Sequence, residues 1–225
     1  MVNEKTLGII SLTSYPARIK NVGKTIYRFI KMCPEFHIVL NLCSLEFSNK
    51  EKDLPEDLRV FQENGLIEIL WHDKNYRVLM KTLFAIAKYK DFPVISADDD
   101  NYPKINYPMI LYKEWLKDKT QFISFWGEKY KDTIHLGGNF TLTPPYAYGE
   151  YGVKCLTDVI IETREDDPYY TVLRHKMGLT NCRVLPGYPV SSVIEVHDEI
   201  NPLHNLYRNR DYNYAFDINE KEIVL

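Results

Sequence analysis

The first half of the chain alternates short apolar segments with amphipathic ones. Short apolar segments rich in β-branched residues are typical of buried strands, and apolar residues three and four positions apart are typical of helices. These rules predict strands at residues 6–12, 37–42, 67–71, 93–97 and 122–126. They predict helices at residues 22–30, 48–64, 79–87 and 107–116. Strands that alternate with helices indicate a parallel sheet with right-handed crossovers, which is an α/β fold.

The periodic pattern weakens in the second half. Gly137-Gly138, Pro144-Pro145 and the glycines at 149 and 152 indicate loops and turns. One further helix is predicted near residues 170–177, and the tail from His197 onward is polar. Because no linker, repeat or low-complexity tract interrupts the chain, we expect one domain over residues 1–225.

Composition narrows the class of protein. The chain is 45% hydrophobic and 26% charged, as is usual for soluble globular proteins. Its net charge of -3 argues against a general nucleic-acid binder, which needs clustered positive charge. The 17 tyrosines suit either ordinary packing or a cleft in which rings stack on sugars or bases. The cysteines lack zinc-site spacing and are expected to be reduced, mostly buried thiols: Cys33, Cys43, Cys155 and Cys182.

Neither a signal peptide nor a bilayer-spanning segment is predicted. The first residues run directly into a short apolar strand, and no apolar run approaches the roughly 18–20 residues that a spanning helix needs. We therefore expect a cytoplasmic protein that is either free in solution or in contact with the membrane surface. Its oligomeric state cannot be inferred from the sequence.

The strongest chemical signal is a run of three aspartates, Asp98, Asp99 and Asp100, directly after the strand predicted at 93–97. In parallel sheets, ligands bind outside the carboxyl ends of the strands. Because side chains alternate along a strand, we expect Asp98 and Asp100 on one side and Asp99 on the other. Two converging carboxylates suit Mg²⁺ or Mn²⁺, whose remaining ligands are water and phosphate oxygens. The alternative is a solvated acidic turn that caps the next helix.

Several segments together resemble one family. The opening IISLTSYPARI at residues 9–19 and the block ISADDD at residues 95–100 are the most specific matches. Looser matches are DLPEDL at 53–58, Gly65-Leu66, Tyr102-Pro103, Gly137-Gly138, Pro144-Pro145 and Asp166-Asp167. In this order they resemble bacterial glycosyltransferases from capsule and lipopolysaccharide gene clusters, over about residues 7–184.

The resemblance implies a GT-A fold, the nucleotide-diphospho-sugar transferase fold, with a Rossmann-like, mostly parallel sheet flanked by helices. The nucleotide-binding half would lie at about 1–103 and the acceptor-side half at about 104–225. The implied enzyme moves a hexose, with weak preference for inversion, from a nucleoside-diphosphate sugar to a hydroxyl of a glycan or lipid-linked glycan. UDP is preferred over GDP by this analogy alone, and Mn²⁺ or Mg²⁺ is the implied cofactor.

The resemblance also assigns residues. The loop at 13–18 would wrap the base and ribose, with Arg18 near the diphosphate; its assigned members are Thr13, Ser14, Tyr15, Pro16 and Arg18. Asp98 would contact the ribose or the metal, Asp99 the nucleotide sugar, and Asp100 would be the firmer metal ligand. His197 is a candidate third metal ligand, and His204 lies in the same tail.

Two basic residues and two acidic ones complete the predicted site. Arg77 and Lys81 would hold phosphate oxygens, although the family has adjacent lysines where this chain has Arg77-Val78. Asp166, or else Asp167, would deprotonate the acceptor hydroxyl. The family commonly has a Trp two positions further on, where this chain has Pro168-Tyr169. The alternative for all four residues is that they are ordinary charged side chains on solvated parts of helices.

The backbone of Gly137 and Gly138 would approach the donor or acceptor sugar, although a plain turn also explains the pair.

Other functions remain as alternatives. A sugar-phosphate nucleotidyltransferase also uses aspartates and a metal, but usually has a Gly-rich basic loop after the first strand. Tyr102 does not fit the phosphatase pattern D-x-D-x-[TV], and the P-loop motif is absent from the sequence. A non-catalytic carbohydrate-binding module with a degenerate transferase fold is the alternative outside the enzymes.

Overall fold

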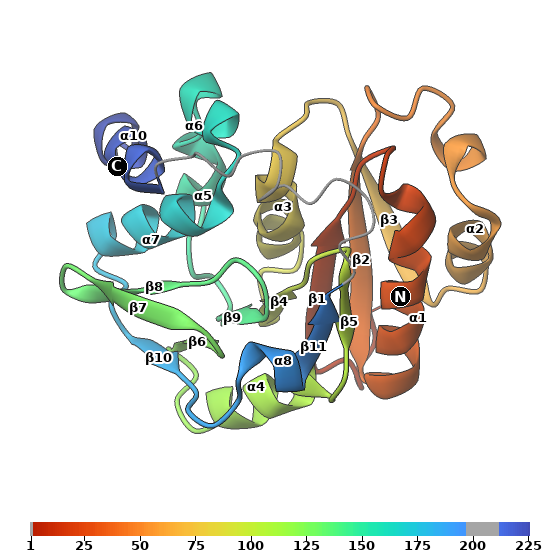
Figure 1. The fold of residues 1–225 in the computed structure, drawn as a ribbon, viewed down its shortest axis with the longest axis horizontal. Coiled ribbons are helices and arrows are strands. Elements are labelled where there is room, and N and C mark those ends of the chain that lie inside the picture. The colour runs from red at the N-terminus through yellow and green to blue at the C-terminus, as the bar shows by residue number, and fades with distance from the viewer. Residues whose placement is uncertain (1, 197–211) are drawn as a thin grey trace.

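A central sheet dominates the computed structural model, which describes residues 2–196 and 212–225 (Figure 1). Its seven strands follow the order β10-β6-β9-β4-β1-β2-β3. The strands are β1 Gly8–Thr13, β2 Phe36–Cys43, β3 Ile67–His72, β4 Val94–Ser96, β6 Phe122–Ser124, β9 Thr141–Thr143 and β10 Cys182–Val184. All neighbours pair in parallel except β9, which is antiparallel to β4 and β6. The prediction of a mostly parallel sheet is confirmed.

Helices connect the strands. They are α1 Ile19–Met32, α2 Glu56–Glu63, α3 Met80–Lys88, α4 Tyr107–Trp115, α5 Tyr151–Lys154, α6 Asp158–Thr163, α7 Asp166–Lys176, α8 Val190–Val193 and α10 Tyr212–Glu222, with the 3-10 turns η1 Lys50–Asp53 and η2 Arg77–Leu79. Two antiparallel ribbons flank the sheet. One joins β5 Asn101–Pro103 to β11 Ile194–Val196, and the other joins β7 Gly127–Tyr130 to β8 Thr133–Leu136.

The sheet has an apolar layer on each face because its side chains alternate. In β1, Ile10 and Leu12 join a cluster with apolar residues of α1, α2 and α4. Ile9, which precedes Ile10 and so points to the opposite face, joins a second cluster with apolar residues of α3, α6 and α7. All three are fully buried. Strands enclosed on both faces explain why the predicted strands are almost continuously hydrophobic.

Several segments of the second half were not predicted, and α7 begins four residues before its predicted start; two differences have a clear physical reason. Residues 48–64 form the short η1 and then α2, because Leu54 before Pro55 is extended (φ -84°, ψ 146°). A residue before proline is disfavoured in the helical region, and this breaks the predicted helix. Strand β9 lies where loops were predicted. It is only three residues long, and its pairing with distant β4 and β6 leaves no local periodic signal.

The four thiols are free, and three of them are buried, as expected. Within the residues that the structure describes, no helix is both long enough and apolar enough to cross a membrane.

Candidate functional site

The three aspartates lie where β4 ends beside β1. Ala97 donates a backbone hydrogen bond to Ser11 (3.0 Å), which extends the parallel alignment by one residue. Asp99 and Asp100 then form a turn. The alternation expected of a continuing strand therefore stops, and the three carboxylates take directions that the strand rule did not predict. Asp98 forms an ion pair with Lys81. Asp99 and Asp100 both form ion pairs with Arg18.

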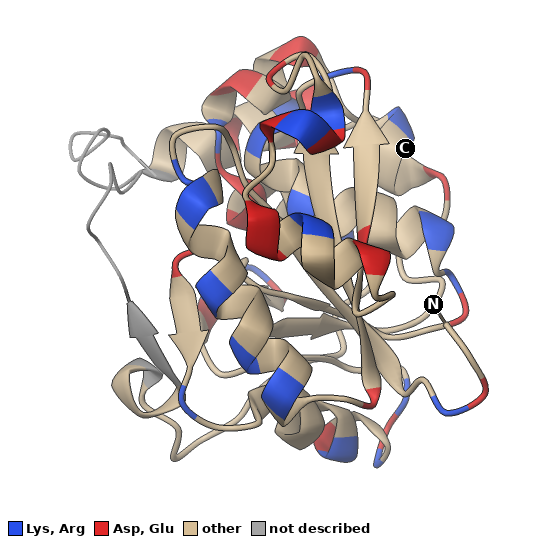
Figure 2. Ribbon diagram, turned by 90° about the vertical axis from the view of Figure 1, so that its right-hand side faces the viewer, with Lys and Arg blue, Asp and Glu red and all other residues tan. Residues whose placement is uncertain are grey.

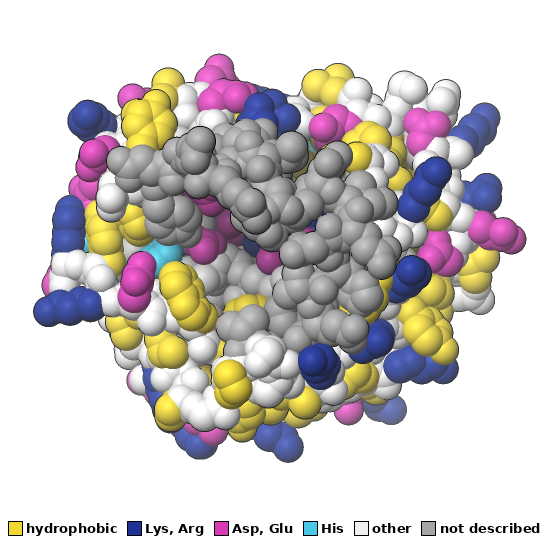
Figure 3. Space-filling view, in the orientation of Figure 1, with side chains coloured by type: hydrophobic (Ala, Val, Ile, Leu, Met, Phe, Trp, Pro, Cys, Tyr) yellow, Lys and Arg dark blue, Asp and Glu magenta, His cyan; other side chains and the backbone are white. Residues whose placement is uncertain are grey.

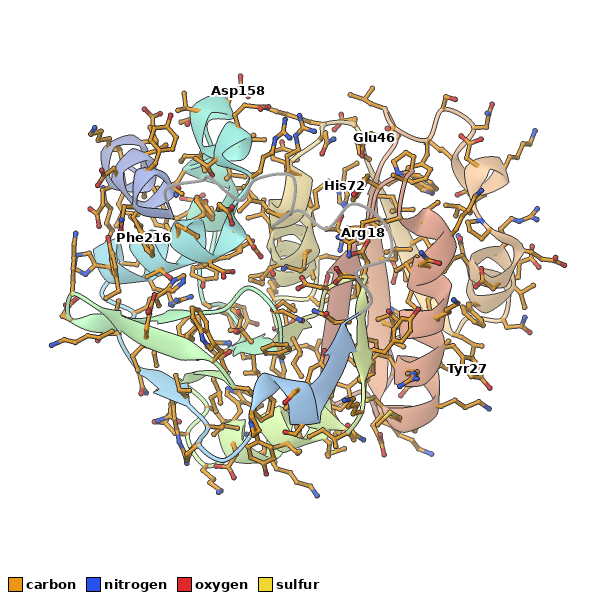
Figure 4. All side chains as sticks on the ribbon, viewed as in Figure 1. Arg18, Tyr27, Glu46, His72, Asp158 and Phe216 are labelled. Atoms are coloured by element: carbon orange, nitrogen blue, oxygen red, sulfur yellow. The ribbon has the colours of Figure 1, made fainter. Side chains whose placement is uncertain are left out.

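Arg18 connects the opening loop to the aspartates (Figure 4). It occupies the N-cap position of α1, and its guanidinium forms ion pairs with Asp99 (2.7 Å) and with Asp100. Ser14 donates a hydrogen bond from Oγ to Asp99 Oδ2 (2.6 Å). Tyr15 lies beside Arg18, with the guanidinium carbon 6.0 Å from the ring centre. The loop that was expected to meet a nucleotide thus lies against the acidic turn.

Burial controls the electrostatics of this pair of carboxylates. Desolvation raises the pKa of Asp99 from 3.8 to about 6, against the opposing effects of Arg18 and the Ser14 hydrogen bond. It also raises the pKa of Asp100, and the neighbouring charge of Asp98 adds to this increase. Burial alone would lower the pKa of Arg18, but Asp99 and Asp100 raise it above its usual value. Added positive charge would therefore be stabilised here.

Lys81 connects the aspartate turn to the acidic motif at the start of α7. Its ammonium nitrogen lies 2.7 Å from Asp98 Oδ1 and 2.9 Å from Asp166 Oδ2, and its side chain is only 6% exposed. Desolvation would lower the pKa of Lys81, but Asp166 and Asp98 raise it. Two segments that the sequence singled out, 68 residues apart, therefore meet through one buried cation.

The glycine pair lies against the same helix terminus. A Cβ atom on Gly138 would lie 2.1 Å from Asp167 Oδ1 and 2.4 Å from Asp166 Oδ2, so the backbone approaches both carboxylates closely. Asp167, Gly137 and Gly138 line a water-sized cavity of about 10 Å³. At Gly137 a Cβ would meet Trp126 at 3.1 Å instead. Close approach requires glycine at position 138.

Not every predicted residue joins this cluster. Arg77 is paired with Glu162 of α6 (3.5 Å), and its side chain is 36% exposed. Thr13 ends β1, where its Oγ1 donates to the Asn41 carbonyl (2.9 Å). Pro16 lies in the exposed turn before α1. His197 and His204 lie outside the described residues.

The sequence analysis missed three polar residues that hold the aspartate turn. Asn139 accepts a hydrogen bond from the Asp98 backbone N–H (3.1 Å), and Asn101 donates from Nδ2 to Asp98 Oδ2 (3.1 Å). Thr25 of α1 donates to the Asp99 carbonyl (2.9 Å). All three are buried. Asn101 and Asn139 directly follow motifs that the sequence singled out, and this adjacency was the available signal.

The oxygen donors suit a hard divalent cation that keeps several external ligands. No group of three or more His, Cys, Asp or Glu side chains is arranged to hold a metal within residues 2–196 and 212–225. Asp98 and Asp100 are partly exposed, at 36% and 20% of their side chains. Mg²⁺ and Mn²⁺ sites commonly use one or two carboxylates and leave the remaining positions to water and phosphate oxygens. Asp98 and Asp100 supply two such carboxylates, close enough for the charge of Asp98 to raise the pKa of Asp100, although each also pairs with a different cation, Lys81 or Arg18.

Comparison with solved structures places the architecture among the GT-A folds, as the sequence predicted. The mannosyltransferase PcManGT from Pyrobaculum calidifontis, solved with GDP-Man and Mn²⁺, is similar over 96% of this chain and 68% of its own. The TM-score is 0.55 and the sequence identity 12%, so the similarity is one of fold.

GalNAc-T7, solved with UDP, GalNAc and Mn²⁺, matches 64% of this chain and 26% of its own. Its TM-score is 0.43 at 16% identity, which is too low to support an argument. No family model matches the sequence, and no curated protein matches it.

Proposed function

We propose that this protein is a metal-dependent glycosyltransferase that moves a sugar from a nucleoside-diphosphate donor to a hydroxyl of a glycan or lipid-linked glycan. The observation that carries the proposal is the junction of Asp98, Asp99 and Asp100 with Arg18 and Lys81 at the carboxyl end of β4. Carboxylates and buried cations placed side by side at this edge of a GT-A sheet suit a ligand that brings both a metal and phosphates.

Different residues would bind different parts of the sugar-nucleotide donor. Arg18 offers a planar guanidinium for phosphate oxygens, and Lys81 a compact positive charge. Asp98 and Asp100 would hold Mn²⁺ or Mg²⁺, which when bound neutralises the leaving diphosphate as a Lewis acid. Ser14, Tyr15 and the rest of the loop at 13–18 would enclose the base and ribose. His197 stays a candidate third ligand, and Arg77 a candidate phosphate contact.

Asp166 is our proposed general base. Its Oδ2 contacts Lys81, so we assign proton acceptance from the acceptor hydroxyl to Oδ1. Asp167, whose Oδ1 lies on the same side of Gly138 as Asp166 Oδ2, is the second candidate. An attacking hydroxyl activated by this carboxylate fits inversion at the anomeric carbon of a hexose.

Titration calorimetry with UDP and GDP, with and without Mn²⁺, tests donor binding. We expect metal-dependent binding of one of them. Asp100→Ala should reduce turnover roughly 100–1,000-fold, or about 3–4 kcal/mol, by removing a ligand of the phosphate-neutralising metal. The exposed Asp91→Ala is the matched control. Wild-type turnover by the Asp100 variant would disprove the assigned role.

A second experiment tests the base. Asp166→Asn should lose acceptor-dependent transfer while it still binds nucleotide, since the amide cannot take up the proton. Asp158→Asn, at an 86% exposed position of α6, should transfer normally. If Asp166→Asn transfers normally and Asp167→Asn does not, the base is Asp167.

The resemblance to capsule and lipopolysaccharide enzymes supports a cytoplasmic role at the inner face of the membrane, with UDP as the nucleotide. A non-catalytic carbohydrate-binding module remains the second candidate, because the chain departs from the family at Val78 and at Pro168-Tyr169. Slow hydrolysis of the sugar nucleotide without acceptor would favour the enzyme, and a complete lack of it the module. Pyrophosphate release from an NTP and a sugar phosphate would instead identify a nucleotidyltransferase.

A further inference from the structure

One face of α1 carries a row of cations. Lys20, Lys24, Arg28 and Lys31 are spaced by four, four and three residues, which places them on one side of a helix. The sequence of α1 contains no Asp or Glu. Figure 2 shows the resulting blue positions below one another along this helix, and Figure 3 shows dark-blue side chains next to yellow ones over the same flank. The surface of α1 is therefore positively charged, although the whole chain has a net charge of -3.

These cations are not used by internal ion pairs. None of the four has a carboxylate partner within 4.0 Å in the part of the chain that the structure describes. Two of them lie over rings instead: Arg28 over Tyr102 (5.1 Å) and Lys31 over Tyr27 (5.5 Å). Their positive charge remains available to a ligand.

A groove of about 370 Å³ opens between α1, α2 and β5. Its lining combines Lys24 and Arg28 with the rings of Tyr27, Phe61 and Tyr102, and with Asp57 of α2. The floor depends on Gly23, where a Cβ would lie 1.9 Å from Asp57 Oδ2, so the two helices approach closely there. Ligand pockets typically begin at about 300 Å³.

We propose that this groove is a saccharide-binding site for acidic sugars, which carry a carboxylate on the ring. Aromatic faces pack on the apolar faces of sugar rings, while Arg28 and Lys24 would pair with the carboxylate. Tyr27 is half exposed and already lies parallel to Phe61 (19° between ring planes), which gives the groove a firm aromatic wall. The hydroxyl groups of the sugar would donate hydrogen bonds to the Asp57 carboxylate.

The charge and shape together favour an acidic saccharide over an anionic membrane. A flat lipid surface would be met best by a convex, wholly cationic face. Here the cations border a concavity whose lining also contains aromatic rings and the Asp57 carboxylate, which can accept hydrogen bonds from sugar hydroxyls but not from ionised lipid phosphates. A chain of acidic sugars can instead follow the row from Lys20 to Lys31.

The groove is separate from the proposed donor site. Arg28 lies ten residues beyond Arg18 on the same helix, a rise of about 15 Å. Figure 4 shows Arg18 at the N-terminal end of α1, beside the strands, and Tyr27 further along the helix on its outer side. The inference therefore goes beyond donor binding. It is tested without nucleotide, so its failure would leave the proposed transferase activity standing, and the reverse also holds.

The experiment is calorimetric titration of the full chain with tetragalacturonate, and with maltotetraose as the uncharged counterpart. We expect binding of the acidic oligosaccharide that weakens as salt is added, because exposed charges are screened. Lys24→Ala with Arg28→Ala should weaken it about tenfold or more. Lys90→Ala with Lys113→Ala, both exposed and outside the groove, is the matched control and should change nothing.

Two single variants sharpen the test. Tyr27→Ala should weaken binding several-fold while the melting temperature stays close to that of the wild type, since the ring is half exposed. Asp57→Asn should leave binding intact or tighten it, because it removes the one negative charge of the lining. Equal affinity for both oligosaccharides, or no loss in the Lys24/Arg28 variant, overturns the proposal. So does binding to phosphatidylglycerol vesicles without binding to tetragalacturonate.

Discussion

Lys81 is a buried cation held by two carboxylates. Its ammonium group lies between Asp98 and Asp166 and is almost completely buried. Removing one partner of a buried ion pair leaves an uncompensated charge, which costs more than the pair contributes. Lys81→Met should therefore lower the free energy of unfolding by about 3 kcal/mol, measured by urea denaturation at pH 7.

Lys88→Met on the same helix is its control. Lys88 pairs with Glu68, but its side chain is 45% exposed, so we expect a loss below about 1 kcal/mol. Equal losses in the two variants would show that burial of Lys81 has no energetic role.

Asp99 provides a second prediction at the residue scale, for pH dependence. Its pKa is raised from 3.8 to about 6 by burial, so the folded state binds the proton more tightly than the unfolded state. This contribution to stability is complete below pH 3.8 and is lost as the pH rises to about 6. Asp99→Asn keeps the uncharged form at every pH. Its stability relative to the wild type should therefore rise by up to about 3 kcal/mol between pH 4 and pH 7.

Urea unfolding of both proteins at each pH measures this difference. Asp100, whose pKa is also raised, is present in both proteins, so its own titration largely cancels. A difference that falls as the pH rises would mean that Arg18 lowers the pKa of Asp99 more than burial raises it.

At the scale of elements, the site depends on how closely the loop at 137–140 approaches the first turn of α7. Gly138→Ala would place a methyl group 2.1–2.4 Å from carboxylate oxygens of Asp167 and Asp166, and Lys81 holds the latter. We expect a loss of about 1–3 kcal/mol on thermal or urea unfolding. Gly137→Ala meets Trp126 at 3.1 Å and the Asn139 carbonyl at an ordinary 3.9 Å, and should lose less stability. The reverse order would contradict the close approach described here.

The elements that the sequence predicted well are those formed by local contacts. β1, β2, β3, α1 and α3 lie within about three residues of their predicted ends, because each has its own apolar periodicity. β9 was not predicted, since its three residues gain their stability from β4 and β6.

The site shows the same division. The sequence singled out Arg18, Lys81 and Asp98–Asp100 as candidates, but it could not indicate that Lys81 joins Asp98 to Asp166. An acidic turn was named only as the alternative to a continuing strand, and the contact to Arg18 that Asp99 and Asp100 share was not predicted.

At the scale of the whole molecule, the two halves of the chain build one sheet and share its buried apolar layers. Ile10 and Ile95 from the first half share a buried cluster with Ile123 and Leu142 from the second. β4, which leads into the aspartates, lies between β1 and β9 and so joins the halves at the site itself. A ligand that bridges the loop at 13–18, the aspartate turn and α7 should therefore stabilise the molecule as a unit.

That coupling yields a prediction for thermal unfolding. With UDP or GDP at one hundred times its dissociation constant and Mn²⁺ present, binding adds about 2.7 kcal/mol to the folded state. For a chain of 225 residues this corresponds to a rise in melting temperature of about 5–10 °C. Nucleotide alone and Mn²⁺ alone should each give much less, and EDTA should abolish the rise. Asp100→Ala should lose the rise relative to its own ligand-free melting temperature, whereas Asp91→Ala should keep it. A full rise in the Asp100 variant, or in EDTA, would mean that the nucleotide binds without the two carboxylates and the cation that they are proposed to hold.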